Sequence, residues 1–132
     1  MIYIYKAELI RVVDGDTVDL IVDLGFDTLR KERFRLYGID APEMNTLAGK
    51  AAKAWLWEAL QPLEAIYVET IQLETKAKRD KYGRFLAVLY GELPTLIPIM
   101  REPIHPSSIN AKMITEGHAK SDSGSTASTH RR

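Results

Sequence analysis

The sequence of 132 residues contains no cysteine and only three histidines. The absence of cysteine excludes disulfide bonds, thiolate catalysis and cysteine-ligated zinc. His105, His118 and His130 are scattered along the chain, so we do not expect a histidine-rich metal site. Sulfur and imidazole ligands are thus lacking, and a metal site would depend on oxygen ligands.

Long apolar runs are also missing. No stretch comes near the ~18 consecutive apolar residues of a membrane span, so we expect no membrane contact. The first residues, Met1–Lys6, lack a basic segment followed by a long apolar run. They predict a strand rather than a signal peptide. On this basis we expect a cytoplasmic protein, while a mature secreted form stays open.

The chain has no net charge, because 18 Lys and Arg balance 18 Asp and Glu. A net charge of zero argues mildly against a protein that binds nucleic acid. The charges are segregated, however: residues 30–35 carry four cations and one anion, and residues 76–84 carry five cations and one anion. Such segregation suits a polyanion and a bound cation that share one site, and solvated strand edges and loops are the alternative. The acidic side chains gather at Asp14, Asp16, Asp19, Asp23 and Asp27.

The composition, 45% hydrophobic and 27% charged, is that of one ordinary globular domain. We place this domain at residues 1–120. It includes an irregular insert at 92–106, which holds four of the six prolines. The polar tail, residues 121–132, is expected to be disordered because it has almost no apolar side chains.

The first forty residues predict a β-meander. Val18, Leu20, Val22 and Leu24 alternate with polar residues, as in a half-buried strand. Asp14-Gly15 precedes that strand and predicts a hairpin turn, since glycine accepts a positive φ. A third strand is expected at about 30–39, with Phe34 and Arg35 on opposite faces.

The remaining elements follow from apolar stripes and caps. A helix is expected from about Thr46 to Gln61, with Trp57 off its apolar stripe. Strands are expected at 66–73 and 85–90, followed by a last helix that Ser107 or Ser108 caps and Gly117 ends. This order predicts a β-rich α+β fold, a five-stranded OB-fold barrel with two packed helices. An α+β sandwich would have a similar pattern.

Three clusters carry the chemistry. They are Asp14-Gly15-Asp16-Thr17, the segment 35–43 and the segment 80–84. Taken alone, each cluster could have a purely structural role. The first could be a turn, residues 40–43 could be a helix capping box, and the third could be a loop before a strand. Arg35 alone could be a surface cation. All three clusters in this order are much less expected by chance.

Together these clusters resemble the staphylococcal nuclease (thermonuclease) family. The resemblance covers roughly residues 7–120 and implies an OB barrel. It rests on Val13-Asp14-Gly15-Asp16-Thr17-Val18, Phe34-Arg35-Leu36, Ile39-Asp40-Ala41-Pro42-Glu43, Asp80-Lys81-Tyr82-Gly83-Arg84, Ile109-Asn110 and Gly117-His118-Ala119.

The resemblance implies a calcium site. Asp16 and Asp40 match the family's carboxylate ligands, while Asp14 and Glu43 match acidic positions that act on the metal indirectly. Position 41 is Thr in the best-known member and Ala41 here. That member uses the backbone carbonyl at this position, so Ala41 should serve equally.

The resemblance also implies a calcium-dependent endonuclease that hydrolyses DNA and RNA with weak sequence preference. Arg35 and Arg84 match the phosphate-binding arginines, and Glu43 matches the residue usually proposed as general base. Lys81 and Tyr82 match positions that contact the phosphate. The chemistry agrees, because a hard cation screens the phosphodiester and two guanidinium groups bind the charge that grows as water attacks.

Two departures from the family limit what can be transferred. The insert at 92–106 is longer than the corresponding hairpin, and only a polar tail stands where the best-known member has a third helix. We therefore expect the third helix to be absent. The insert, a second copy of the chain or a shorter core would replace it, so the protein is expected to be a monomer or a homo-dimer. Our hypothesis is that Trp57 and the insert's apolar residues take over that burial.

Two functions of other classes stay open. One is a nuclease-like OB domain that binds nucleic acid or protein without cutting. The other is an assembly protein with a vestigial site.

Overall fold

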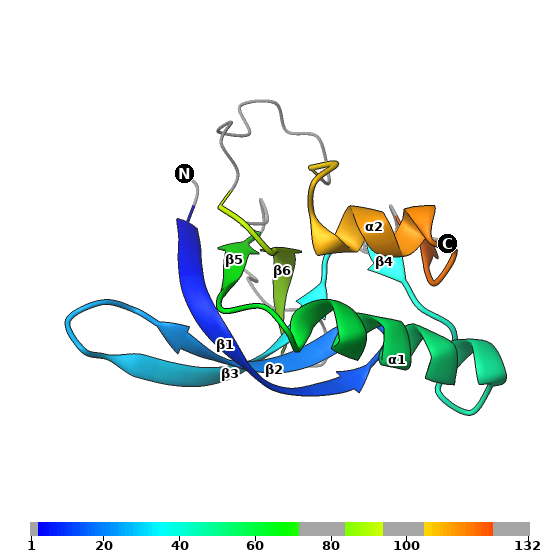
Figure 1. Ribbon diagram of the computed structural model, residues 1–132, viewed down its shortest axis with the longest axis horizontal. Helices are drawn as coiled ribbons and strands as arrows, with labels where there is room; N and C mark the ends of the chain where they lie inside the picture. The colour runs from blue at the N-terminus through cyan, green and yellow to red at the C-terminus, as the bar shows by residue number, and fades with distance from the viewer. Residues whose placement is uncertain (1–2, 72–83, 94–104, 123–132) are drawn as a thin grey trace.

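The computed structural model describes residues 3–71, 84–93 and 105–122. Figure 1 shows both helices on one side of the molecule and a long β-hairpin on the opposite side. No helix in these three ranges has the length and apolar character needed to cross a membrane. The described elements are β1 (Tyr3–Asp14), β2 (Thr17–Asp23), β3 (Leu29–Leu36), β4 (Ile39–Asp40), α1 (Leu47–Leu60), β5 (Ile66–Thr70), β6 (Phe85–Tyr90), α2 (Ile109–Thr115) and β7 (Lys120–Ser121).

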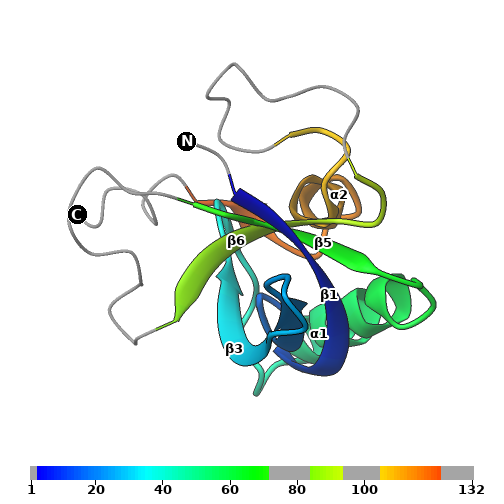
Figure 2. The ribbon, with the colours of Figure 1, turned by 90° about the vertical axis from the view of Figure 1, so that its left-hand side faces the viewer.

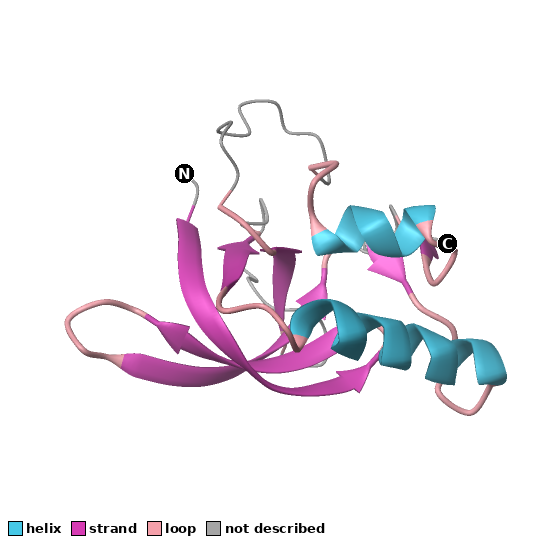
Figure 3. Cartoon of the chain, in the orientation of Figure 1, coloured by secondary structure: helices cyan, strands magenta, loops and turns pink. Residues whose placement is uncertain are grey.

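Five of the strands close into a barrel in the order β1-β2-β3-β6-β5. The pairing of β3 with β6 is parallel, and the other barrel pairs are antiparallel. Figure 2, seen from the hairpin end, shows these strands curving around one another. Strands β4 and β7 form a separate two-stranded sheet. The predicted five-stranded OB-type barrel with two helices is confirmed (Figure 3).

Strand β2 follows the predicted alternation. Val18, Leu20 and Val22 are buried in the barrel, where they form part of one core with residues of both helices. Leu24 departs from the pattern and is 40% exposed, because β2 ends one residue earlier at Asp23. The alternation therefore ends with the strand.

The turn between β1 and β2 has a different basis from the predicted one. Gly15 does not adopt a positive φ, so the turn does not depend on that freedom. A Cβ atom at Gly15 would instead lie 2.7 Å from the Cβ of Ala41 and 2.9 Å from the Cβ of Ala52. Glycine is needed here because the turn packs against helix α1 and the segment after β4.

Helix α1 begins where the sequence predicts. The Thr46 side chain accepts a hydrogen bond from the Gly49 backbone N–H at 2.9 Å, which caps the helix. Asp40 lies in strand β4, so the alternative reading of residues 40–43 as a helix cap is wrong. The predicted apolar stripe consists of Ala48, Ala52, Trp55, Leu56, Ala59 and Leu60. Ala52, Leu56 and Leu60 are buried, whereas Ala48 is exposed.

Helix α2 is anchored to the barrel by a buried amide. The Asn110 side chain donates to the backbone carbonyls of Tyr37 and Ala87 and accepts from the Leu89 backbone N–H. Because all these bonds are made, burying the amide leaves no polar group unsatisfied. Ser108 caps the helix, and Gly117 follows its end with φ of 83°.

The first two residues of the expected tail, Ser121 and Asp122, differ from the expectation of disorder. Lys120–Ser121 form strand β7 against β4, and the backbone N–H of Asp122 donates to the Gly38 carbonyl at 2.8 Å. The rest of the expected tail, 123–132, lies outside the described residues, as do 94–104 of the insert. Within the described part, which ends at Asp122, no third helix is present. Trp57 is 45% exposed, so the hypothesis that it takes over the burial is wrong for its own side chain.

Candidate functional site

Arg35 lies at the centre of the predicted site. It stands near the end of β3, where the alternation that buries Phe34 and Leu36 directs it to the other face. One terminal nitrogen, Nη1, donates to the Leu36 carbonyl at 3.0 Å and to the Ile39 carbonyl at 2.9 Å. These two hydrogen bonds to backbone carbonyls hold the guanidinium in one orientation.

Three carboxylates from separate parts of the chain approach this guanidinium. Asp16 Oδ2 lies 3.4 Å from Nη1. Asp40 Oδ1 and Asp122 Oδ2 each lie 3.7 Å from the other terminal nitrogen, Nη2. The β1–β2 turn, strand β4 and the residue after β7 thus meet at Arg35, whose side chain is only 13% exposed. Asp16, Arg35 and Asp40, which were assigned to one site, thus lie together, with the carboxylates around the Arg35 guanidinium.

Asp16 is held by several hydrogen bonds. Its Oδ2 accepts from the Ala41 backbone N–H at 3.0 Å and its Oδ1 from the Thr17 hydroxyl at 3.3 Å. Its own backbone N–H donates to the Asp14 carboxylate at 3.1 Å. Burial raises the pKa of Asp16 from 3.8 to about 6, against the opposing charge of Arg35. The nearby Asp14 raises this pKa further.

Arg84 reaches the same turn from the start of β6. Its Nη1 donates to the Thr17 hydroxyl at 3.1 Å, and that hydroxyl also contacts Asp16. Thr17 pairs with Arg35 across β2 and β3. Arg35 and Arg84, which are distant in sequence, therefore both reach the β1–β2 turn from the neighbouring strands β3 and β6.

Glu43 combines a fixed backbone with an exposed carboxylate. Its carbonyl accepts hydrogen bonds from both the backbone N–H and the hydroxyl of Thr46. A Cβ atom at Gly49 would overlap that carbonyl, so the first turn of α1 packs directly against it. No hydrogen bond or ion pair joins the Glu43 carboxylate to another described residue, which leaves it available for water or substrate.

A cavity of about 470 Å³ lies beside Glu43. One wall is the segment from Asp40 to Glu43, and the other is the segment from Gly117 to Lys120, before and into β7. In this second wall the His118 ring packs near Trp55, with ring centroids 5.8 Å apart. Asp40 and Glu43 therefore share a hollow large enough for part of a nucleotide or a hydrated ion.

The chain is similar in sequence to known proteins over most of its length. The sequence profile for staphylococcal nuclease homologues matches residues 33–131. The chain belongs to the staphylococcal nuclease family. Over 115 residues it is 32% identical to micrococcal nuclease from Shigella flexneri, covering 87% of this chain and 57% of that protein. Over 114 residues it is 30% identical to Protein ParB from Escherichia coli, covering 86% of this chain and 55% of that protein.

The chain thus spans little more than half the length of these two relatives. The part matched to the staphylococcal nuclease family begins at Arg33, so it contains Arg35, Asp40, Glu43 and Arg84. The β1–β2 turn with Asp16 precedes it. The contacts in the structure, and not the sequence profile, show that this turn lies beside the matched residues.

The oxygen atoms available at this site are of the chemical type that a hard cation prefers as ligands. Asp16 and Asp40 supply carboxylate oxygens, and no hydrogen bond among the described residues uses the Ala41 carbonyl. Oxygen ligands of this type suit calcium. Within the described ranges, no three Asp, Glu, His or Cys side chains are arranged to hold a metal together. The Arg35 guanidinium instead lies beside both carboxylates.

Two predicted contacts, Lys81 and Tyr82, lie outside the described residues. Two residues of the site were not predicted. Thr17 belongs to the Asp14-Gly15-Asp16-Thr17 cluster, so a contact of its hydroxyl with Asp16 or Arg84 could have been predicted. Asp122 had no such signal, because a polar tail gives no periodicity that would reveal its pairing near β4.

Proposed function

We propose that this chain hydrolyses phosphodiester bonds in DNA and RNA, with calcium as its metal and weak sequence preference. The observation that carries the proposal is the placement of Arg35, Arg84, Asp16 and Asp40 around one turn of the barrel. Membership in the staphylococcal nuclease family supports it.

The arginines would bind the scissile phosphate. A guanidinium stays protonated and donates two hydrogen bonds in one plane, which matches the oxygens of a phosphate. Nη1 of Arg35 donates to two backbone carbonyls, so Nη2, which lies beside Asp40 and Asp122, is the terminal nitrogen that would bind the phosphate. Arg84 would bind the same group from the side of Thr17. Contacts to phosphate alone would give little sequence preference.

Asp16, Asp40 and the carbonyl of Ala41 would hold the calcium ion, with Asp14 and Glu43 acting on it indirectly. When bound, the metal would screen the phosphodiester charge and orient water. Glu43 would take a proton from the attacking water, since its carboxylate is exposed beside the cavity that Asp40 also lines. Lys81 and Tyr82 stay predicted phosphate contacts.

Alanine variants test these roles. We expect Arg35→Ala and Arg84→Ala to lower kcat about 100- to 1000-fold, the usual effect of losing one donor to the transition state. Glu43→Ala should lower it on the order of 10²- to 10⁴-fold. The measurement is hydrolysis of labelled DNA and RNA with calcium present.

Arg33→Ala is the matched control, because Arg33 lies on the same strand but pairs with Asp19, at 2.7 Å, and not with Asp16 or Asp40. It should retain the parental rate. If all three site variants cut as fast as the parent, the assigned roles are wrong.

One observation favours a second candidate, a domain that binds nucleic acid without cutting. Arg35 lies among three carboxylates, which compete with a phosphate for it. Such a domain would bind a labelled strand and leave its length unchanged with calcium, magnesium or chelator. A shortened product that requires a metal excludes this candidate.

A further inference from the structure

Helix α1 carries a groove on its outer surface, away from the barrel core. Trp57 within it is 45% exposed, although a tryptophan normally buries most of its large apolar surface. The groove has a volume of about 380 Å³ and is lined by Met44, Lys50, Lys53, Ala54, Trp57 and Glu58. We call it the α1 groove.

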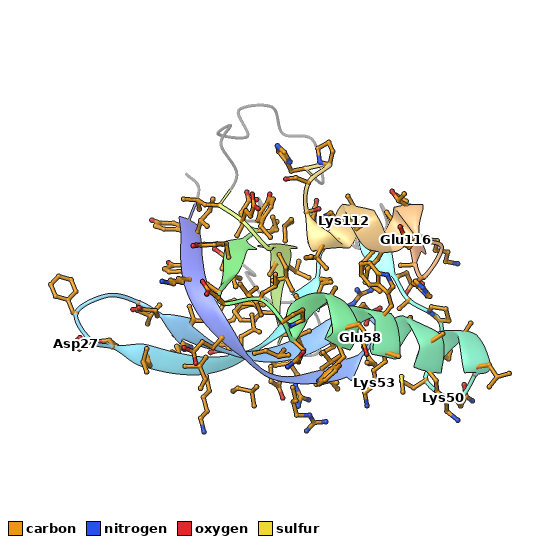
Figure 4. The ribbon with its side chains drawn as sticks, viewed as in Figure 1. Asp27, Lys50, Lys53, Glu58, Lys112 and Glu116 are labelled. Atoms are coloured by element: carbon orange, nitrogen blue, oxygen red, sulfur yellow. The ribbon has the colours of Figure 1, made fainter. Side chains whose placement is uncertain are left out.

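The positive charges of the α1 groove favour the binding of a polyanion. Lys50, Lys53 and Trp57 are three and four residues apart, so their side chains lie on one helix face. Figure 4 shows Lys50 and Lys53 on the side of α1 that faces away from α2. Neither lysine forms an ion pair with another residue in the described part of the chain. Glu58 is the one acidic side chain among the lining residues.

The α1 groove is connected to the candidate active site through the start of α1. It begins at Met44, the residue directly after Glu43. The Glu43 carbonyl accepts two hydrogen bonds from Thr46 and packs against Gly49, so the first turn of α1 is held directly against Glu43. From Lys50 to Trp57 the helix rises about 10 Å.

We propose that the α1 groove binds single-stranded nucleic acid where the substrate strand leaves the active site. The lysines bind successive phosphates, and the Trp57 indole stacks on a base. A single strand is required because a base must leave its stack to reach the indole. This inference rests on the proposed function, since it extends the same substrate beyond the bond that is cut.

A protein segment is the competing occupant. It would use the apolar surfaces of Met44 and Trp57 and would need the lysines little. Salt dependence separates the two, because release of counterions from phosphates makes nucleic-acid binding fall steeply with salt.

The first experiment measures binding without cleavage. The full chain is titrated into a fluorescein-labelled single-stranded DNA of about 12 nucleotides, with chelator and several salt concentrations, and polarisation is recorded. We expect Lys50→Gln with Lys53→Gln to reduce the slope of log affinity against log salt by about one to two. Trp57→Ala should weaken binding roughly tenfold, and Trp57→Phe should retain most of it.

Other charged positions give controls of both signs. Glu58→Gln removes the groove's carboxylate and should strengthen binding. Lys112→Gln and Glu116→Gln change exposed charges on or at the end of α2, away from the α1 groove, and should have no effect (Figure 4). Equal affinity and equal salt slopes for the parent and all groove variants would overturn the proposal.

The second experiment compares hydrolysis of two substrates. The double lysine variant should raise KM several-fold for the 12-nucleotide strand and leave kcat and KM unchanged for a dinucleotide, which is too short to reach Lys50. An equal loss on both substrates would mean that the substitutions disturb the active site, and the inference would be wrong. If the parent cuts neither substrate, the proposed function fails, and the binding measurement alone decides the role of the groove.

Discussion

At the scale of single residues, Asp16 is notable because its charged carboxylate is buried. It is 9% exposed, and its carboxylate accepts hydrogen bonds from Ala41 and Thr17. Burial still raises its pKa to about 6, although Arg35 opposes the rise. The folded protein therefore binds a proton at Asp16 more tightly than the unfolded chain does. Stability from this group is complete below about pH 4 and falls as the pH rises from about 4 to 6.

Replacing this carboxylate should stabilise the protein at neutral pH. Asp16→Asn keeps an oxygen for the Ala41 N–H and removes the buried charge. One pKa unit corresponds to about 1.4 kcal/mol and the pKa of Asp16 rises from 3.8 to about 6, so we expect the free energy of unfolding at pH 7 to rise by up to about 3 kcal/mol. The same variant should lose hydrolysis, because it removes a proposed calcium ligand.

Urea denaturation with chelator, at about pH 4 and pH 7, measures this effect. The gain should be present at pH 7 and absent at pH 4. Asp19→Asn is the control, since Arg33 lowers the pKa of that surface carboxylate. It should not stabilise the protein at pH 7. A variant at position 16 that is no more stable than the parent at pH 7 would show that burial of this charge carries no cost.

At the scale of secondary-structure elements, the short strand β7 adds a residue to the site. Its pairing with β4 places Lys120 opposite Asp40 and Ser121 opposite Ile39. The next residue, Asp122, is fixed by its hydrogen bond to Gly38 and contacts Arg35 at 3.7 Å. A two-residue strand thus brings a carboxylate to the Nη2 edge that the substrate would need.

Asp122 should therefore compete with the substrate phosphate for Arg35. Its side chain is 28% exposed, so the ion pair contributes no more than about 1 kcal/mol. We expect Asp122→Asn to lower KM about two- to fivefold and to leave kcat within about twofold. Steady-state kinetics on a single-stranded substrate test this, with Glu116→Gln as control. An unchanged or higher KM would contradict the competition.

Most elements could be predicted because each carries a local pattern. The alternation of β2 and the apolar stripe of α1 were sufficient to place both elements. The basis of the β1–β2 turn could not be predicted, since Gly15 is needed for contacts with Ala41 and Ala52 that only the folded chain brings together. The same holds for Asp122, whose partner Arg35 is 87 residues away in the sequence.

At the scale of the whole molecule, closure of the barrel creates the site. The β1–β2 turn, the end of β3, β4 and the start of β6 meet only because β3 pairs with both β2 and β6. The sequence predicted this meeting through motifs that resemble the staphylococcal nuclease family, not through any local pattern. Helix α1 also carries the α1 groove, whose lining begins at Met44, directly after Glu43.

The central claim is that this convergence cuts phosphodiester bonds with a divalent cation. Cleavage of a labelled single-stranded DNA by the purified full chain, titrated with calcium and then with chelator, tests it most directly. We predict a rate that rises with calcium to saturation, returns to background with chelator, and is at background at every calcium concentration for Arg35→Ala. An intact strand at all calcium concentrations, or equal cleavage by the parent and Arg35→Ala, would contradict it.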